Sequence, residues 1–331
     1  MHIPDNYLSP STCAVMTAAM VPVWTVSIRK VKQELPKAKL PQLGVCAAFS
    51  FLMMMFNVPL PGGTTGHAVG GTLIAILLGP YAACISVSVA LLIQALLFGD
   101  GGILAFGANC FNMAFVLPFL GYFLYKFVRE RSHSRLGEYA GISLGAYFGM
   151  AVAALCAAIE FGIQPLLFHT AAGQPLYCPY PLSVSIPAML IPHLTVACVV
   201  EVLFTALIYM FVKQVSPDML PAGSGKKSKA VWGLLAALIC LTPLGLLATG
   251  TAWGEWGADE IAGITSGGNA LGFVPEGMKN GFNFSALLPD YSVSGLPEVA
   301  GYLLSAVLGV ALLVIIFKVA GSFTREKVRA S

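Results

Sequence analysis

The sequence predicts an all-α membrane protein, a polytopic bundle of about nine transmembrane helices with the amino terminus outside and the carboxy terminus inside. Its 331 residues are 57% hydrophobic and only 10% charged, and the mean hydropathy is +0.81. That composition is typical of the membrane class. Apolar stretches of roughly spanning length occur at 8–28, 42–57, 67–79, 81–98, 105–127, 138–161, 184–212, 231–249 and 298–320, the third being short.

The positive charges support this topology. With the amino terminus outside, the cytoplasmic segments are 29–41, 80, 126–137, 213–230 and 321–331, and every Lys and Arg except Lys279 lies in or beside them. Cytoplasmic loops carry such an excess of Lys and Arg. The net charge of +3 reflects this bias and indicates no nucleic-acid partner. We therefore expect a multi-pass protein of the inner or plasma membrane, in contact with the lipid bilayer.

The first helix has a well-defined start. Ser9 can cap it and Pro10 follows in the first turn, where the missing N–H of proline costs nothing. Basic residues follow the apolar stretch 8–28 instead of preceding it, which argues against a cleaved signal peptide. We therefore expect the amino terminus to be retained, just outside or within the outer leaflet.

The first two residues form a potential metal chelate. Met1 offers its free α-amine, and His2 offers its backbone amide and its imidazole Nδ1. These three nitrogens close two fused rings in one plane and leave the fourth corner of a square open. Pro4 has no N–H and a fixed φ, so the backbone beyond the chelate is stiff. A Met-His terminus alone is usually an initiator methionine before an accidental polar residue, so the interpretation depends on a fourth ligand.

A glycine- and proline-rich segment supplies the candidate. Residues 57–71 hold two prolines and five glycines, and irregular backbone at membrane depth is tolerated only when it is buried in protein or lines a cavity. Thr64 or Thr65 is expected to cap the third helix, which would leave His67 in its first turn. There the helix dipole would keep the imidazole neutral and able to bind metal. A lone histidine at a helix end is usually a hydrogen-bonded loop residue, but this one faces the Met1-His2 terminus on the outer side.

Three stretches together resemble the cobalt/nickel substrate-specific membrane component, or S component, of energy-coupling-factor transporters. They are Met1-His2-Ile3-Pro4-Asp5 with Tyr7-Leu8-Ser9-Pro10, the Pro-Gly-Gly-Thr-Thr-Gly-His run at 61–67, and residues 98–113. The resemblance covers roughly residues 1–215. It implies a seven-helix component that binds metal through the Met1 amine, the His2 amide and imidazole, and the His67 imidazole. Asn6, where such chains often carry Gly, departs from the pattern outside this ligand set.

The resemblance also implies a function and partners. The chain would take up Co²⁺ or Ni²⁺ as its transported substrate, without a cofactor and without catalysis. It would work with a transmembrane coupling subunit and ATP-hydrolysing subunits on other chains. A planar set of four nitrogens suits Ni(II) or Cu(II) best, allows Co(II), and disfavours Mg(II) and Zn(II). Because the amine and the amide must lose protons, metal capture should weaken as the pH falls.

Four polar residues are candidates to support the site. Asp100, Asn109 and Asn112 lie in or just after the next outer turn and could hydrogen-bond the ligating imidazoles. Turn formation or helix capping explains Asp100 equally well. His169 lies in an outer loop, 162–183, which we interpret as a lid, and is an alternative ligand.

Two ionisable residues fall inside an apolar stretch. His193 and Glu201 lie in the seventh predicted span, where such groups are rare and usually face the protein interior. They could support helix packing or coupling, and nothing in the sequence connects them to metal. Residues 141–145 match the G-x-S-x-G hydrolase pattern but lie within an apolar helix, so no catalytic residue is predicted.

The chain divides into three parts. Residues 1–215 form the metal-binding component, 216–230 a basic cytoplasmic linker, and 231–331 a two-helix unit with a large outer loop. The linker does not fit the phosphate-loop pattern, so any ATPase lies on another chain. The last part resembles the small two-helix auxiliary subunit of the same transporters. Its acidic loop could attract cations toward the mouth of the site, although a scaffolding hairpin explains it equally well.

Two other classes of function are weaker fits. A self-sufficient secondary transporter or channel with broken helices would transport without nucleotide hydrolysis, and usually shows internal repeats, which we do not find. An intramembrane metalloprotease would require an H-E-x-x-H motif, which the sequence lacks.

Overall fold

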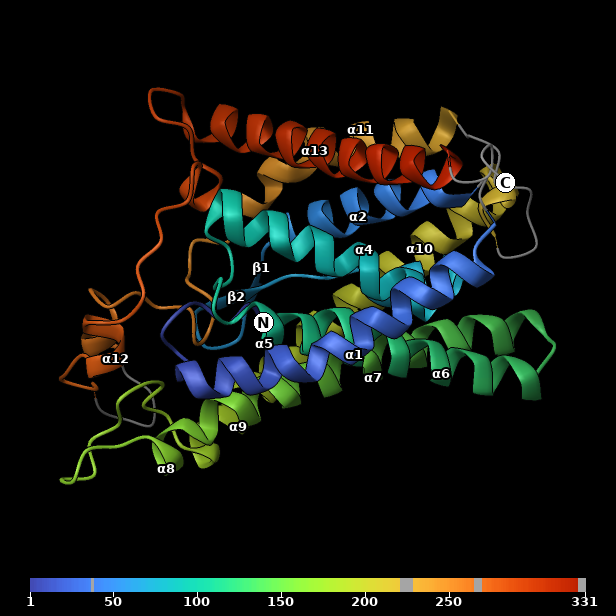
Figure 1. The fold of residues 1–331 in the computed structure, drawn as a ribbon. Coiled ribbons are helices and arrows are strands. Elements are labelled where there is room, and N and C mark those ends of the chain that lie inside the picture. Colours follow the sequence, from blue (N-terminus) through green and yellow to red (C-terminus); the bar gives the residue numbers. More distant parts are fainter. Residues whose placement is uncertain (37–38, 221–228, 265–269, 327–331) are drawn as a thin grey trace.

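The computed structural model describes residues 1–36, 39–220, 229–264 and 270–326. Within these ranges the chain is mostly helical, as predicted, and a two-stranded antiparallel hairpin is the one sheet (Figure 1). The hairpin strands are β1 (Val58–Leu60) and β2 (Thr64–Gly66). The helices of the first part are α1 (Pro10–Glu34), α2 (Leu40–Met55), α3 (Gly71–Leu78), α4 (Pro80–Ile93), α5 (Phe106–Asn109), α6 (Leu117–Arg131), α7 (Arg135–Gly162), α8 (Gln164–Leu167), α9 (Leu182–Pro192) and α10 (Cys198–Val215).

The carboxy-terminal unit predicted at 231–331 is called the second part below, and the component at 1–215 the first part. The second part adds three helices. They are α11 (Lys229–Leu241), α12 (Glu276–Lys279) and α13 (Glu298–Glu326). In the first part, π-helical turns at Gln94–Phe98, Cys110–Val116 and His193–Ala197 extend α4, join α5 to α6 and join α9 to α10. Such turns are often found at functional sites.

Seven helices in the described part of the chain are long and apolar enough to cross a membrane. They cover Pro10–Glu34, Pro80–Phe98, Phe106–Arg131, Arg135–Leu167, Leu182–Val215, Lys229–Leu247 and Glu298–Ser322. The predicted stretches 42–57 and 67–79 correspond to two shorter helices, α2 with 16 residues and α3 with 8. At 1.5 Å per residue α3 is only about 12 Å long. The protein is a multi-pass membrane protein, and its nine-crossing topology remains a prediction.

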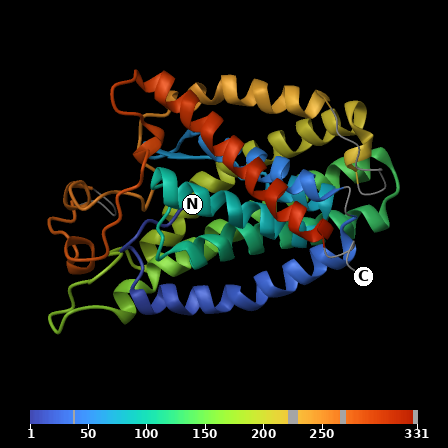
Figure 2. The same ribbon diagram turned by 45° about the horizontal axis from the view of Figure 1, so that its top comes forward.

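The first helix begins as predicted. The Ser9 side chain accepts a hydrogen bond from the Thr12 N–H at 3.1 Å, and Pro10 lies in the first turn. Much of α1 is exposed, including Val15 at 66%, which is how a lipid-facing helix presents apolar side chains. Figure 2 shows α1 and α11 on opposite sides of the bundle.

The predicted start of the third helix is wrong. Thr64 and Thr65 belong to β2, and α3 begins only at Gly71, after Gly70 with a φ of 73°. His67 therefore lies in an irregular segment before the helix instead of in its first turn. The change follows from a tertiary contact, because the buried Glu201 carboxylate accepts hydrogen bonds from the N–H groups of Val69 and Gly70. Glu201 thus holds the two residues directly before α3, and the first turn of α3 has no side-chain cap.

The second part packs directly on the first. Helix α13 lies along α2, where a Cβ on Gly309 would stand 2.3 Å from the Phe51 ring. Such close approach is the usual role of small residues between membrane helices. Near the β1–β2 hairpin the Tyr302 hydroxyl donates to the Met55 carbonyl at 2.7 Å. The loop between α11 and α13 can therefore reach this end of the first part.

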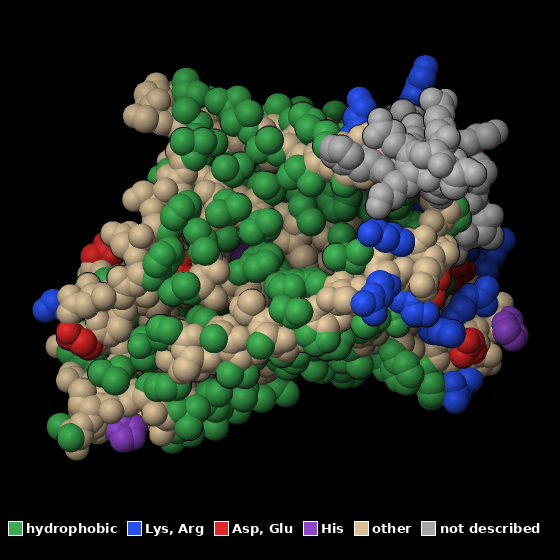
Figure 3. Space-filling view, viewed as in Figure 1, with side chains coloured by type: hydrophobic (Ala, Val, Ile, Leu, Met, Phe, Trp, Pro, Cys, Tyr) green, Lys and Arg blue, Asp and Glu red, His purple; other side chains and the backbone are tan. Residues whose placement is uncertain are grey.

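Lys and Arg side chains gather at one end of the bundle, opposite the end that carries α8 and α12 (Figure 3). This distribution supports the proposed orientation. We expect a membrane-impermeant maleimide to label Cys introduced at the exposed Ala172 in intact cells, and to label Cys at the exposed Gln33 only after permeabilisation. The unmodified chain controls for reaction of its own cysteines. The reverse pattern at either position would contradict an outside amino terminus.

Candidate metal centre

The amino-terminal segment is buried in the protein. Met1, His2 and Ile3 are 5%, 2% and 0% exposed. The Ile3 N–H donates to Asn109 Oδ1 at 2.7 Å, and its carbonyl accepts from Asn109 Nδ2 at 3.0 Å and from the Gly102 N–H at 2.8 Å. These three hydrogen bonds fix the backbone directly after His2. The sequence predicted that Asn109 could hydrogen-bond the ligating imidazoles, whereas in the structure its side chain hydrogen-bonds the backbone of Ile3.

A second set of contacts fixes the segment further along. The Asp5 carboxylate accepts hydrogen bonds from the N–H groups of Ile103 and Leu104, at 3.0 and 2.7 Å. A Cβ on Gly102 would lie 2.5 Å from the Asp5 backbone nitrogen, so only glycine permits this approach. The loop after α4 therefore holds the first residues of the chain through hydrogen bonds and close packing.

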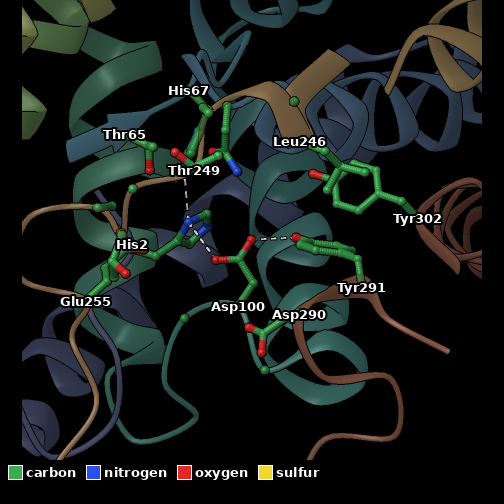
Figure 4. A pocket seen from close by; sticks show the side chains of 18 of the residues that line it. His2, Thr65, His67, Asp100, Leu246, Thr249, Glu255, Asp290, Tyr291 and Tyr302 are labelled. Atoms are coloured by element: carbon green, nitrogen blue, oxygen red, sulfur yellow. Dashed lines mark hydrogen bonds and ion pairs between the residues drawn. The ribbon is translucent and has the colours of Figure 1, made fainter. Parts of the chain in front are cut away.

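The two predicted histidine ligands lie side by side (Figure 4). His67 Nε2 is 3.2 Å from His2 Nδ1, and the ring centroids are 4.9 Å apart. Two imidazole nitrogens bound to one ion at about 2.0–2.1 Å, at right angles, would be roughly 2.9 Å apart. The observed separation is thus close to that of neighbouring corners around a metal. His67 Nδ1 is 3.1 Å from the Ala68 carbonyl. A proton on that nitrogen satisfies the contact and leaves the Nε2 lone pair directed at His2.

Glu201 holds the segment that carries His67. Its side chain is fully buried, and its carboxylate accepts from the N–H groups of Val69 at 2.8 Å and Gly70 at 3.0 Å. The Ser50 hydroxyl donates to the Val69 carbonyl at 2.8 Å. Sequence reasoning assigned Glu201 no role at the site. The available signal was a carboxylate inside an apolar stretch, which must find donors when buried.

Burial keeps both imidazoles neutral. It lowers the pKa of His2 to about 3, with a further contribution from the charged amino terminus, and it lowers the pKa of His67 well below its usual value. The expected cause, a helix dipole at His67, does not apply because His67 precedes the helix. Neutral imidazoles are the form that binds metal.

Asp100 contacts the candidate ligands directly, and two other predicted residues do not. Asp100 Oδ1 is 3.0 Å from His2 Nδ1. Asn112 instead donates to Glu160 Oε2 at 2.9 Å. His169 is exposed, with Nδ1 3.0 Å from the Thr170 carbonyl, and does not line the cavity beside His2 and His67. The structure therefore gives no support to His169 as an alternative ligand.

His193 lies beside Met1 and does not line the cavity that reaches His2 and His67. It is buried, its Nδ1 is 2.7 Å from the Met189 carbonyl, and it lines a small cavity together with Met1. This placement is consistent with helix packing around the Met1 side chain.

The outer loop of the second part closes over the site. The Met1 amine is 3.5 Å from Glu255 Oε1, and the Glu255 carboxylate also faces the His2 backbone N–H. Burial raises the pKa of Glu255 to about 7. A cavity of about 520 Å³ reaches His2, His67 and Asp100, and the second part lines it with Glu255, Asp290, Tyr291, Glu298 and Tyr302 among others. The sequence indicated an acidic loop but none of these contacts.

Side chains alone do not complete a metal site here. Across the described residues, no group of three or more His, Cys, Asp or Glu side chains is arranged to hold a metal ion. A metal between His2 and His67 would need further ligands, and the main-chain nitrogens of Met1 and His2 belong to the same buried segment. The arrangement therefore suits a chelate that uses backbone nitrogen.

Comparison with known proteins agrees with the sequence resemblance. Residues 2–219 match the family described as the cobalt uptake substrate-specific transmembrane region, CbiM, and residues 227–326 match the PDGLE domain. The chain is 52% identical to the probable fused nickel transport protein LarMN of Lactiplantibacillus plantarum, over 96% of this chain and 97% of that protein. It is 49% identical to the fused nickel transport protein NikMN of Rhodobacter capsulatus, over 95% of each.

A solved structure shares the fold of the first part. A truncated transition metal transporter is 56% identical, with a TM-score of 0.61, and covers 65% of this chain and 99% of its own. The relatives are named as transport proteins and not as enzymes, in agreement with the prediction that the chain is not an enzyme. The chain therefore belongs to the family of the cobalt uptake substrate-specific transmembrane region, and it carries a PDGLE domain after that region.

Proposed function

We propose that this protein captures Ni²⁺ or Co²⁺ from outside the cell, as the substrate-specific component of an energy-coupling-factor transporter. The metal binds to the Met1 amine, the His2 amide nitrogen, His2 Nδ1 and His67 Nε2. The observation that carries the proposal is the 3.2 Å approach of the two imidazoles beside a buried, firmly held amino terminus. The two nitrogens come from residues 65 positions apart in sequence, and each can present a lone pair to a metal ion.

Nickel is the favoured substrate. Three fused relatives that match nearly the whole chain are named as nickel transport proteins. A planar set of four nitrogens is also the geometry that Ni(II) accepts most readily among the two candidates. Cobalt remains the competitor, and a competition titration of the purified protein with both ions ranks them directly.

Transport requires partners on other chains. In this proposal the three parts of the chain, 1–215, 216–230 and 231–331, provide capture, connection and closure, while a transmembrane coupling subunit and ATPases provide the driving force. The chain alone should then bind metal without accumulating it in vesicles. Accumulation by the chain alone would instead indicate a self-sufficient secondary transporter or channel.

Proton release tests the ligand set. We expect about one to two protons to leave per bound Ni²⁺ at pH 7, because the His2 amide must lose its proton and the amine must be deprotonated. The imidazoles release none, since the lowered pKa values keep both rings neutral at this pH. Calorimetry in buffers of different ionisation enthalpy measures this number. Affinity should rise with pH for the same reason.

Metal binding without proton release at pH 7 would contradict the proposed ligand set. It would mean that imidazoles and carboxylates hold the ion without backbone nitrogen. The four-nitrogen proposal would then be wrong, even if transport of the metal were established.

A further inference from the structure

A tyrosine of the second part reaches into the metal site. The Tyr291 hydroxyl donates to Asp100 Oδ2 at 2.5 Å. Gln94 Nε2 donates both to the Tyr291 hydroxyl at 2.8 Å and to Asp100 Oδ2 at 3.1 Å. The other carboxylate oxygen, Oδ1, lies 3.0 Å from His2 Nδ1. Tyr291 and Gln94 thus hold one oxygen of Asp100, and the other oxygen faces a candidate ligand. Figure 4 shows Asp100 between Tyr291 and His2.

The Tyr291 ring is held in place by aromatic neighbours. It is 7% exposed and stacks on Phe98 with centroids 4.7 Å apart and an interplanar angle of 22°. Tyr302 packs against it edge-on at 5.5 Å. The Tyr291 carbonyl accepts from the Ser305 hydroxyl at 2.8 Å. These contacts fix the ring, so the hydroxyl has little freedom to leave Asp100.

The backbone at this point adopts an unfavourable conformation. Asp290 and Tyr291 have φ values of 51° and 58°, in the left-handed region, although neither is glycine. Two such residues in succession are costly and persist only where surrounding contacts enforce them. The loop is anchored just before them by the Leu288 N–H, which donates to the Leu97 carbonyl at 2.8 Å. This left-handed backbone conformation directs the Tyr291 side chain toward Asp100.

We propose that Tyr291 is a positioning residue of the metal site, which acts by holding the Asp100 carboxylate toward the ligand nitrogen His2 Nδ1. The inference rests on the proposed function, since it assumes that His2 binds the metal. A carboxylate fixed beside the ligands stabilises the positive charge of the bound ion. Before the ion arrives, Nδ1–H of the neutral His2 ring donates to Asp100 Oδ1, which aligns the ring. When the ion binds at Nδ1, that proton moves to Nε2, so the ring releases none and less ordering is left for the binding step.

In this proposal both parts of the chain contribute residues to the site. The four ligand nitrogens and Asp100 come from the first part, whereas Tyr291, which orients Asp100, comes from the second. Metal affinity should therefore depend on a single hydroxyl about 290 positions along the chain from the metal ligands Met1 and His2. This role differs from general attraction of cations by an acidic loop, because tyrosine carries no charge.

A double-mutant cycle in the full chain tests the proposal. We expect Tyr291→Phe to lower Ni²⁺ affinity by roughly tenfold, the lower end of the range for residues that support metal ligands. Asp100→Asn should lower it at least as much. Because Tyr291 acts through Asp100, the double variant should bind no more weakly than Asp100→Asn alone. Affinity is measured by competition with a chelator of known strength.

Tyr147→Phe is the matched control. It also removes a tyrosine hydroxyl that donates a hydrogen bond, but that hydroxyl donates to the Leu194 carbonyl, and Tyr147 does not line the cavity beside His2 and His67. Its affinity should stay within about twofold of the parent. The visible absorption band of bound Ni(II) should be the same in Tyr291→Phe as in the parent, because the four ligands are unchanged.

The outcomes separate this inference from the proposed function. If the parent binds Ni²⁺ with proton release but Tyr291→Phe binds equally tightly, the positioning role is wrong and the ligand set stands. Independent effects of Tyr291→Phe and Asp100→Asn, adding in the double variant, would also overturn it. A parent that fails to bind Ni²⁺ at all would instead overturn the proposed function.

Discussion

An alanine inserted between Met1 and His2 is expected to abolish high-affinity binding of Ni²⁺ or Co²⁺. The insertion moves the α-amine one residue away from the His2 imidazole, so the two fused chelate rings can no longer form. It also displaces a fixed segment, because Met1, His2 and Ile3 are almost fully buried and Asn109 holds both the N–H and the carbonyl of Ile3. We expect affinity to fall by more than a hundredfold, as for loss of a ligand and not merely of its support.

Two controls distinguish loss of the chelate from misfolding. A carboxy-terminal tag adds residues far from the site and should leave affinity unchanged. Acetylation of the amine adds no residue to the chain, yet it removes a ligand and should abolish binding as the insertion does. The protein should also be isolated with Met1 retained and unblocked, which mass spectrometry can check. An uncleaved amino-terminal tag that binds metal as tightly as the native terminus would refute the role of Met1.

The sequence was sufficient to predict which histidines would meet. Two constraints of a membrane chain act together: the positive charges set the side of each loop, and the length of each apolar stretch sets how far it travels. These constraints place His2 and His67 at the same end of the bundle without any knowledge of packing. The structure adds that they lie within 3.2 Å. Ser9 and Pro10 were equally predictable, because a helix cap is a local feature.

The start of the third helix was not predictable for the opposite reason. Thr64 and Thr65 are residue types that often cap helices, but in the structure they form strand β2 of the hairpin. Val69 and Gly70, directly before the true helix start, donate to Glu201, which lies 131 positions after Gly70. No local pattern around residue 64 contains that information. A tertiary contact therefore overrode a local preference, as often happens where a segment serves a site.

The contacts that the second part makes with the site could not be predicted, because they come from a long loop without hydrophobic periodicity. Its acidic residues suggested only attraction of cations, yet Glu255 reaches the Met1 amine and Tyr291 reaches Asp100 across 191 positions. Asn109 and Asn112 show the same limit. Asn109 bonds the main chain of Ile3 and Asn112 bonds Glu160. Amide side chains have many possible partners, and spacing alone does not choose between an imidazole, a backbone group and a carboxylate.

His67→Ala is expected to lower metal affinity by at least a hundredfold while the protein remains folded and inserted. The substitution removes one corner of the planar set, and the hairpin, α3 and the Glu201 contacts that hold its segment do not depend on the imidazole. Loss of one ligand is a larger change than loss of a supporting contact, which costs about 10–100-fold. The three remaining nitrogens should still bind Ni²⁺ weakly, with proton release and a shifted absorption band.

The chain offers a matched control for this variant in His169. It is the same residue type on the same outer side, but it is exposed and does not line the cavity. His169→Ala should bind metal as the parent does, which shows that removing an outer histidine is harmless in itself. Unchanged affinity in His67→Ala would be incompatible with the four-nitrogen site. The two variants together therefore test whether the approach of His67 to His2 has a function or is only a packing contact.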